Sequence, residues 1–307
     1  MYYNNVLEMI GNTPMVKINK LTDKNSATVL AKLEMFNSSG SVKDRIAKYM
    51  IEEAEKRGIL KSDSIIVEPT TGNTGIALAM VAAIKGYKMI AVMPKGMSKE
   101  RERMIKAYGA DILFTPNGGE VDVKLAIEKA EQMSRENPKV FSPNQFKNMD
   151  NVKAHRETTG KEILGQVGGN IDAFVAGVGT GGTLVGVAQA LKEKIPNVKI
   201  IAVEPAGSPI LSEGKSGQHM IQGIGEGFIP EVLKSGLGLI DEIITVTDDD
   251  AINTTRRLAK EEGILAGISS GANMFAALKT AKKLGKGKTV VTIFPDRGER
   301  YLSDDVF

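Results

Sequence analysis

The sequence predicts an α/β protein made of two three-layer α/β/α domains, each with a largely parallel sheet. Strand-like and helix-like segments alternate along almost all of the 307 residues, and this alternation is typical of parallel strands joined by helical crossovers. A loop at 142–146 separates two series of such segments. We therefore expect a smaller domain over 38–146, a larger domain formed by 1–37 and 147–307, and a site in the cleft between them.

In both series, apolar runs of strand length are followed by segments with apolar residues at helical spacing. In the first series we expect strands over 28–34, 64–68, 88–94 and 111–115, and helices that begin near Ser41, over 76–85, from Ser98 to Gly109 and over 121–136. In the second series we expect strands over 171–176, 198–204, 240–246, 264–266 and 289–294, and helices over 153–166, 182–194, 249–262 and 272–284. The stretch 204–230 is rich in Gly and Pro and too long for an ordinary connection, and such loops are often functional.

The composition excludes several classes of protein. A net charge of +3 spread along the chain predicts neither a nucleic-acid nor a membrane partner. The longest strongly apolar run, 76–84, is too short for a membrane span, and the first residues lack the pattern of a signal peptide, so we expect a cytoplasmic protein. The chain has no cysteine, which excludes disulfides and Cys-type zinc sites, and its two histidines show no metal-ligand spacing.

Lys43 is the first candidate catalytic residue. Ser41 stands where an N-cap is expected and Asp44 completes a capping-box pattern, so Lys43 should lie in the first turn of a helix. That end of a helix favours anions, so a lysine gains there if its amine is neutral or carries an anionic partner. A Schiff base to an aldehyde cofactor with a phosphate meets both needs. The alternative is a solvated surface lysine.

Three further loops connect a strand to a helix. The loop 69–75 offers hydroxyls, an amide and free backbone N–H groups, which suit a carboxylate or a phosphate. The glycine-rich loop 177–183 is the most specific local signal for a phosphate. Its glycines, with Glu204 about 20 residues further on, also fit a dinucleotide fingerprint, so an NAD-dependent oxidoreductase is an alternative. The serine pair in 267–271 either caps a helix or places a hydroxyl against a ring nitrogen.

Taken together, these motifs resemble the cysteine synthase (O-acetylserine sulfhydrylase) family of pyridoxal-phosphate enzymes, whose fold is fold type II, similar to the tryptophan synthase β chain. The resemblance covers nearly the whole chain and decides against the oxidoreductase. Its motifs lie at 10–14, 41–45, 71–75, 179–183, 221–225, 267–271 and 298–303.

The resemblance implies a role for each candidate residue. Lys43 would bind the cofactor and later move the substrate α-proton, Asn73 would hydrogen-bond the phenolic oxygen of the cofactor, and Ser269 would face its pyridine nitrogen. The cofactor phosphate would be held by Gly179, Thr180, Gly181, Gly182 and Thr183. The substrate carboxylate would be bound by Thr70, Thr71, Thr74 and Gln145, and the loop that contains Gly225 would line the cleft.

The resemblance also implies the reaction. L-Cysteine would form from O-acetyl-L-serine and sulfide by β-elimination and then β-addition through an α-aminoacrylate, with closure of the smaller domain to exclude water. Members of the family are usually homodimers and often dock the C-terminus of serine acetyltransferase in the cleft. The resemblance therefore implies two partners, a second copy of this chain and the C-terminus of serine acetyltransferase.

The chain departs from the family pattern at positions that bear on specificity. Ser38 follows Asn37 where the family often has proline. Glu226 stands where alanine is common, and its carboxylate either acts on water or a thiol, repels an anionic nucleophile, or points to solvent. Pro-Asp-Arg at 295–297 replaces the frequent Pro-Ser-Ser and resembles the B-type enzymes, some of which accept thiosulfate or O-phosphoserine. Arg297 would either bind such an anion or pair with a neighbouring carboxylate.

These departures leave sister β-replacement enzymes as alternatives: a cystathionine β-synthase, an O-phosphoserine sulfhydrylase, or a cysteine lyase that releases sulfide. A non-catalytic ligand sensor on the same fold is a further alternative, against which the intact Lys43 argues.

Overall fold

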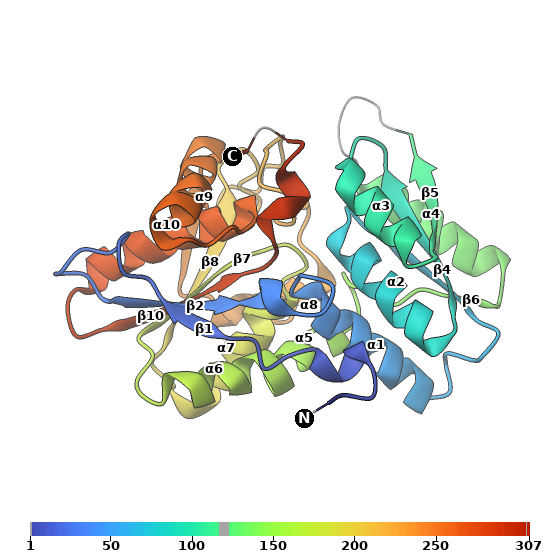
Figure 1. The fold of residues 1–307 in the computed structure, drawn as a ribbon, viewed down its shortest axis with the longest axis horizontal. Coiled ribbons are helices and arrows are strands. Elements are labelled where there is room, and N and C mark those ends of the chain that lie inside the picture. Colours follow the sequence, from blue (N-terminus) through green and yellow to red (C-terminus); the bar gives the residue numbers. More distant parts are fainter. Residues whose placement is uncertain (1, 117–122, 305) are drawn as a thin grey trace.

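Two sheets organise the computed structural model, which describes residues 2–116, 123–304, 306 and 307 (Figure 1). The larger sheet has the strand order β1 (Met15–Lys17), β2 (Thr28–Leu33), β10 (Thr289–Phe294), β7 (Ala173–Gly177), β8 (Lys199–Pro205) and β9 (Glu242–Val246). The smaller sheet has the order β5 (Asp111–Thr115), β4 (Lys88–Pro94), β3 (Ile65–Pro69) and β6 (Val140–Phe141). Within the described residues, the named strands pair in parallel except for β1 with β2. The expected parallel α/β fold is confirmed.

Helices cover both faces of the smaller sheet. On one face, α1 (Lys43–Lys56), α2 (Asn73–Lys85) and α3 (Lys99–Ala107) bury a shared apolar cluster. On the other face, α4 (Val123–Glu136) packs Ala126 and Ala130 against β3 and β4. The helix expected over 121–136 is therefore present, although residues 121 and 122 lie outside the described part of the chain.

The larger sheet is covered in the same way. α5 (Asp150–Ala154), the π-helical turn His155–Thr159, α6 (Gly160–Val167) and α7 (Gly182–Lys194) cover one face, and α9 (Asp248–Glu262) and α10 (Ile268–Leu284) cover the other. The short α8 (Glu231–Lys234) lies in the long segment between β8 and β9. Single turns of 3-10 helix complete the structure at Val6–Met9, Glu34–Phe36, Leu237–Leu239 and Gly298–Tyr301. No helix in the described ranges joins the length and the apolar character that crossing a membrane requires.

Helix α1 connects the two halves of the molecule. It packs against α2 on the side of the smaller sheet and against α5 on the side of the larger sheet. Its Ile46 and Met50 are fully buried with Ala154 of α5. The first residue of α1 is therefore placed between the carboxyl ends of β3 and β7, where parallel α/β sheets commonly bind ligands.

One expected strand is absent. The segment 264–266 forms an isolated bridge from Ala266 to Arg297. The Leu265 carbonyl accepts from the Gly298 N–H, and the Gly267 N–H donates to the Asp296 carbonyl, both beyond the end of β10. Both edges of β10 are already paired with β2 and β7, so a further strand has no free edge to join. A short apolar run is buried either as a strand or as an irregular segment, and its sequence does not distinguish the two.

Candidate active site

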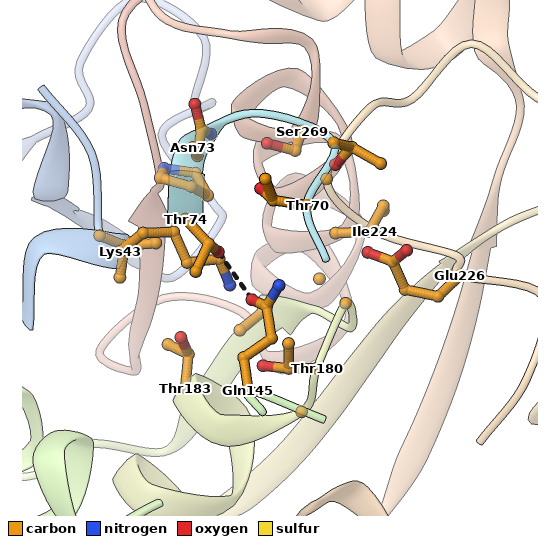
Figure 2. Close-up of a pocket in the computed structure, with 18 of the residues that line it drawn as sticks. Lys43, Thr70, Asn73, Thr74, Gln145, Thr180, Thr183, Ile224, Glu226 and Ser269 are labelled. Atoms are coloured by element: carbon orange, nitrogen blue, oxygen red, sulfur yellow. Dashed lines mark hydrogen bonds between the residues drawn. The ribbon is translucent and has the colours of Figure 1, made fainter. Parts of the chain in front are cut away.

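A cavity lies between the two sheets and is lined by loops that are far apart in the sequence (Figure 2). The loops that follow β3 and β7 meet the N-termini of α1, α2, α7 and α10 there. Among the predicted site residues, those that line the cavity are Lys43, Thr70, Thr71, Asn73, Thr74, Gln145, Gly179, Thr180, Gly181, Thr183, Glu226 and Ser269. Gly182 is the first residue of α7, next to this wall.

Two predicted residues are placed elsewhere, and both placements are corrections. Gly225 is turned away from the cavity, because its N–H donates to the carbonyl of Val178 at 2.9 Å and its own carbonyl accepts from His219 Nε2 at 2.9 Å. Gly223 and Ile224 line the cavity in its place. Arg297 is exposed, and its Nε donates to the carbonyl of Met35 at 2.9 Å. Its guanidinium therefore lies outside the described wall of the cavity, where the sequence suggested an anion site.

Lys43 is the first residue of α1, as predicted, but the cap differs from the predicted one. Val42 occupies the N-cap position, and the Lys43 N–H donates to Ser41 Oγ at 3.3 Å. The Asp44 carboxylate accepts from the Ser39 N–H at 2.6 Å and from the Ser39 hydroxyl. Gly40, with a φ of 91°, turns the chain so that Ser39 rather than Ser41 comes within reach of Asp44.

The environment of Lys43 favours a neutral amine. Burial lowers the pKa of Lys43, and the carboxylates of Glu226 and Asp296 oppose that shift. The positive end of the α1 dipole acts in the same direction as burial. A neutral amine is the form that attacks an aldehyde or takes up a proton.

The glycine loop before α7 forms a cradle for an anion. Gly181 is the N-cap with a φ of 89°, and a Cβ at Gly179 would lie 2.5 Å from the carbonyl oxygen of Gly223, so side chains are excluded at both positions. Backbone N–H groups and the hydroxyls of Thr180 and Thr183 remain as donors. A phosphate takes such a donor set at a helix N-terminus without a cation.

The opposite wall is the loop that leads into α2. Thr74 Oγ1 donates to Gln145 Oε1 at 2.6 Å, and Gln145 Nε2 donates to the carbonyl of Pro69 at 3.1 Å, which fixes the orientation of the Gln145 amide (Figure 2). Thr70 Oγ1 accepts from the N–H groups of Gly72 and Gly75 at 2.9 and 3.0 Å. Hydroxyl and amide donors at a helix N-terminus suit a carboxylate.

In Figure 2, Glu226 and Lys43 lie on opposite sides of the drawn residues. Its side chain lines the cavity and is half-buried there. Burial raises the pKa of Glu226, and the Lys43 amine opposes the shift. Among the described residues, none donates a hydrogen bond to this carboxyl. A carboxyl in this state is able to exchange a proton with a molecule in the cavity.

Sequence reasoning missed several residues of the site. Arg101 lies in a charged run typical of a solvent-facing helix, yet it is 3% exposed and lines the cavity. Asn273 also lines the cavity, and its Oδ1 is buried without a partner in the described structure. His155 lies behind Thr183, with Nε2 3.2 Å from Thr183 Oγ1 and Nδ1 2.9 Å from Thr159 Oγ1. Burial lowers the pKa of His155 to about 3, so the ring is neutral. Nothing in a single sequence distinguishes these residues from their neighbours.

A lysine amine beside a phosphate cradle is what an aldehyde cofactor with a phosphate requires, and the surrounding fold is that of the fold-type-II pyridoxal-phosphate enzymes. The comparison with known families confirms the expected fold, cofactor and enzyme class. The chain belongs to the pyridoxal-phosphate dependent enzymes, whose family model matches residues 6–296. The dinucleotide alternative fails for a local reason as well, because the Glu204 carboxylate accepts from the N–H groups of Leu211 and Ser212 and from the Ser212 hydroxyl.

The chain is similar along its whole length to enzymes of cysteine metabolism. It is 53% identical to a cysteine synthase of Staphylococcus aureus over 305 residues, which are 99% of this chain and 97% of that protein. A hydrogen sulfide-producing enzyme from Fusobacterium nucleatum superposes with a TM-score of 0.93 at 47% identity, covering 98% of this chain and 100% of that one. An O-acetylserine dependent cystathionine β-synthase from Helicobacter pylori superposes with a TM-score of 0.94 at 42% identity, covering 100% and 99%. The resemblance to the cysteine synthases is confirmed.

Proposed function

We propose that this chain is a cysteine synthase that forms L-cysteine and acetate from O-acetyl-L-serine and sulfide. The observation that carries the proposal is that Lys43, the glycine loop 177–183 and the loop 69–75 all face one cavity. The chain is also 53% identical to a cysteine synthase over 99% of its length. The acetate leaves from Cβ, and the sulfide adds at the same carbon.

The residues present fit the cofactor. The loop 179–183 would hold its phosphate, Ser269 would face its pyridine nitrogen, and Asn73 would face its phenolic oxygen. Each of these groups lies at a helix N-terminus that opens on the cavity. The bound cofactor supplies an electron sink for the charge that develops at Cα when the α-proton leaves.

Lys43 would serve as the general base. Its Nζ takes the α-proton of the substrate, and the acetate leaves Cβ with the electron pair of the broken C–O bond. The lowered pKa of the Lys43 amine keeps a larger share of it neutral before this step. The same Nζ returns a proton to Cα after sulfide has added to Cβ.

The loop at the start of α2 would hold the substrate in place. Thr70, Thr71, Thr74 and Gln145 would bind its carboxylate, and we propose that residues 38–146 move as a smaller domain that closes on the larger one, formed by 1–37 and 147–307. Arg101 of α3 supports this division, because it reaches Gln222, which precedes Gly223 and Ile224 in the opposite wall of the cavity. Closure would exclude water from the reacting carbon.

The proposal is tested by following L-cysteine formation with sulfide and three donors: O-acetylserine, O-phosphoserine and serine. We expect the highest kcat/KM for O-acetylserine. A preference for O-phosphoserine or serine, or no product from any donor, would contradict the assignment. Homocysteine as an alternative nucleophile separates a cysteine synthase from a cystathionine β-synthase.

Glu226 favours a second activity at the same site, the release of sulfide from cysteine with water as the replacing nucleophile. Its carboxyl faces the cavity with a pKa raised by burial, and a carboxylate placed there is able to take a proton from water as the water attacks Cβ. An alanine at this position would lack that base.

We further propose a cytoplasmic homodimer that is able to bind the C-terminus of serine acetyltransferase. Exposed apolar side chains of the N-terminal segment, at Tyr2, Tyr3, Val6 and Met9, and of Phe36 support a subunit contact. The loop 69–75 would accept a C-terminal carboxylate. Light scattering tests the dimer, and displacement of a labelled C-terminal peptide by O-acetylserine tests the second partner.

A further inference from the structure

A buried hydrogen-bonded cluster lies behind the wall of the cavity and is centred on Asp296. The Oδ2 of Asp296 accepts from Asn73 Nδ2 and from the Tyr301 hydroxyl, each at 2.7 Å. The guanidinium of Arg300 donates to the other end of the same amide, Asn73 Oδ1. Asp296 is 1% exposed, Arg300 3% and Tyr301 0%. Of these four residues, Asn73 is the one that lines the cavity (Figure 2).

The chemistry of the two neighbours determines which way the Asn73 amide points. A carboxylate only accepts hydrogen bonds and a guanidinium only donates them. The reverse orientation would set the amide oxygen against Asp296 and the amide nitrogen against Arg300, and it would lose both bonds inside a buried cluster. Asn73 Nδ2 carries two hydrogens, and Asp296 uses one of them.

Gly267 makes room for the carboxylate. A Cβ at Gly267 would collide with Asp296 Oδ1, and the Gly267 N–H donates to the Asp296 carbonyl at 3.1 Å. Gly267 is the N-cap of α10, so the carboxylate lies at the positive end of that helix. Asp296 Oδ1 is buried without a hydrogen-bond partner among the described residues, so the side chain is held through Oδ2, by Asn73 and Tyr301.

We propose that Asp296 is a positioning residue that, together with Arg300, holds the Asn73 amide so that its second N–H points to the phenolic oxygen of the cofactor. The inference rests on the proposed function, because it assigns Asn73 that contact. A serine in place of Asp296 is shorter, and its hydroxyl both donates and accepts, so it would not hold the amide in one orientation.

The first test is a double-mutant cycle with Asp296→Ser and Asn73→Ala on the cofactor-loaded protein. We expect D296S to shift the visible absorption band and to slow the change that O-acetylserine causes in it about tenfold, as a displaced contact beside the reacting atoms does. Because Asp296 acts through Asn73, the double variant should match N73A alone. Additive effects would overturn the proposal.

Two single variants serve as controls for this cycle. Asp296→Asn keeps an acceptor of the same reach and should preserve the band of the unmodified protein. Arg297→Ser changes the neighbouring exposed residue and should leave band and rate unchanged. A band shifted as far by D296N as by D296S, or shifted by R297S, would contradict the role of Asp296 as an acceptor for Asn73.

The second test uses the cofactor-free protein, and it decides the question if D296S does not fold. At pH 8, Asn73→Asp sets two carboxylates against each other and should lower the midpoint of thermal unfolding. Adding Asp296→Asn restores a carboxylate–amide pair and should recover most of that loss. A double variant no more stable than N73D would overturn the contact. This result does not depend on turnover, whereas a loaded protein that makes no cysteine would count against the proposed function.

Discussion

Glu226 and Lys43 face the same cavity with pKa shifts of opposite sign, both caused by burial. Burial disfavours the charged form of each group, so the amine loses a proton more easily and the carboxyl keeps one more easily. The two groups also attract each other, which limits both shifts. In the proposed reaction, Lys43 would serve as the base for the α-proton and Glu226 as a separate carboxyl for the incoming nucleophile.

Replacing Glu226 with alanine should change the choice of nucleophile more than cofactor binding. We expect E226A to lose about tenfold or more in the release of sulfide from cysteine, since a general base contributes at least that much, while its visible cofactor band stays in place. Sulfide electrode traces and absorption spectra measure the two effects. Glu231→Ala, at the exposed start of α8, is the matched control. If the relative rates with sulfide, water and homocysteine are the same in E226A as in the unmodified protein, the prediction is contradicted.

His155 should make the protein sensitive to mild acid. Burial lowers its pKa to about 3 in the folded chain, whereas a free histidine titrates near pH 6.5. Between these values the unfolded chain binds a proton that the folded chain does not. The contribution of His155 is therefore complete above about pH 6.5, and the free energy of unfolding falls by about 1.4 kcal/mol per pH unit below it.

Urea unfolding at pH 7, 6 and 5 measures this effect, with His155→Gln as the comparison. Glutamine keeps a side chain that donates and accepts hydrogen bonds but does not titrate. The free energy of unfolding of H155Q should therefore fall less steeply with falling pH, by about 1.4 kcal/mol per pH unit. Parallel curves for the two proteins would show that His155 is not the group responsible.

At the scale of the elements, an ion cluster holds α1 against the larger sheet. Arg45 of α1 forms salt bridges with Glu34, which directly follows β2, at 2.6 Å and with Glu162 of α6 at 2.7 Å. Lys32 of β2 bonds Glu162 at 2.7 Å. Burial alone would raise the pKa of Glu34, but the Arg45 guanidinium lowers it. The cluster fixes the direction of the helix that carries Lys43 at its first position.

Removing Arg45 should therefore destabilise the protein strongly. Arg45→Met leaves the fully buried carboxylate of Glu34 without its cation, which should lower the free energy of unfolding by about 3–5 kcal/mol. Denaturant unfolding at pH 8 checks this. Lys56→Met, at the exposed end of the same helix, should leave the unfolding midpoint unchanged. A small effect of R45M would mean that water or another cation compensates Glu34.

Local sequence patterns predicted the elements and the loops of the site better than the contacts between them. The first turn of α1 and the loops 69–75 and 177–183 follow from apolar runs, glycines and hydroxyls that are close in the sequence. The contact of Asn73 with Asp296 joins residues more than 200 positions apart, and the burial of Arg101 depends on Gly72, which leaves room for its side chain. Such contacts depend on how the sheets are placed, which a single sequence does not contain.

At the scale of the whole molecule, closure of residues 38–146 onto the rest should protect the reacting carbon. The Arg101 guanidinium donates a hydrogen bond to Gln222 Oε1, and its Cζ lies 4.9 Å from the ring centroid of Tyr301. Both partners belong to segments of the larger half, so α3 reaches across the cavity. A bound carboxylate at Thr74 would add a second connection between the halves.

Hydrogen–deuterium exchange measures this closure. Added O-acetylserine should slow the exchange of amides in 70–75 and in α3, because these segments become held against the larger half. Helix α6 should be unaffected and serves as an internal control. Thr74→Ala should abolish most of the protection. Equal protection along the whole chain would instead indicate general stabilisation by a ligand.

The visible absorption spectrum of the purified protein reports on the bound cofactor and on both halves of the reaction. We expect a band of the bound cofactor that changes when O-acetylserine is added and returns when sulfide follows, and a Lys43→Ala variant that does not complete this cycle. A band that responds to cysteine or serine but not to O-acetylserine would assign the site to a sister reaction. A protein that shows no visible band, even after pyridoxal phosphate is added, would contradict the proposed cysteine synthase activity.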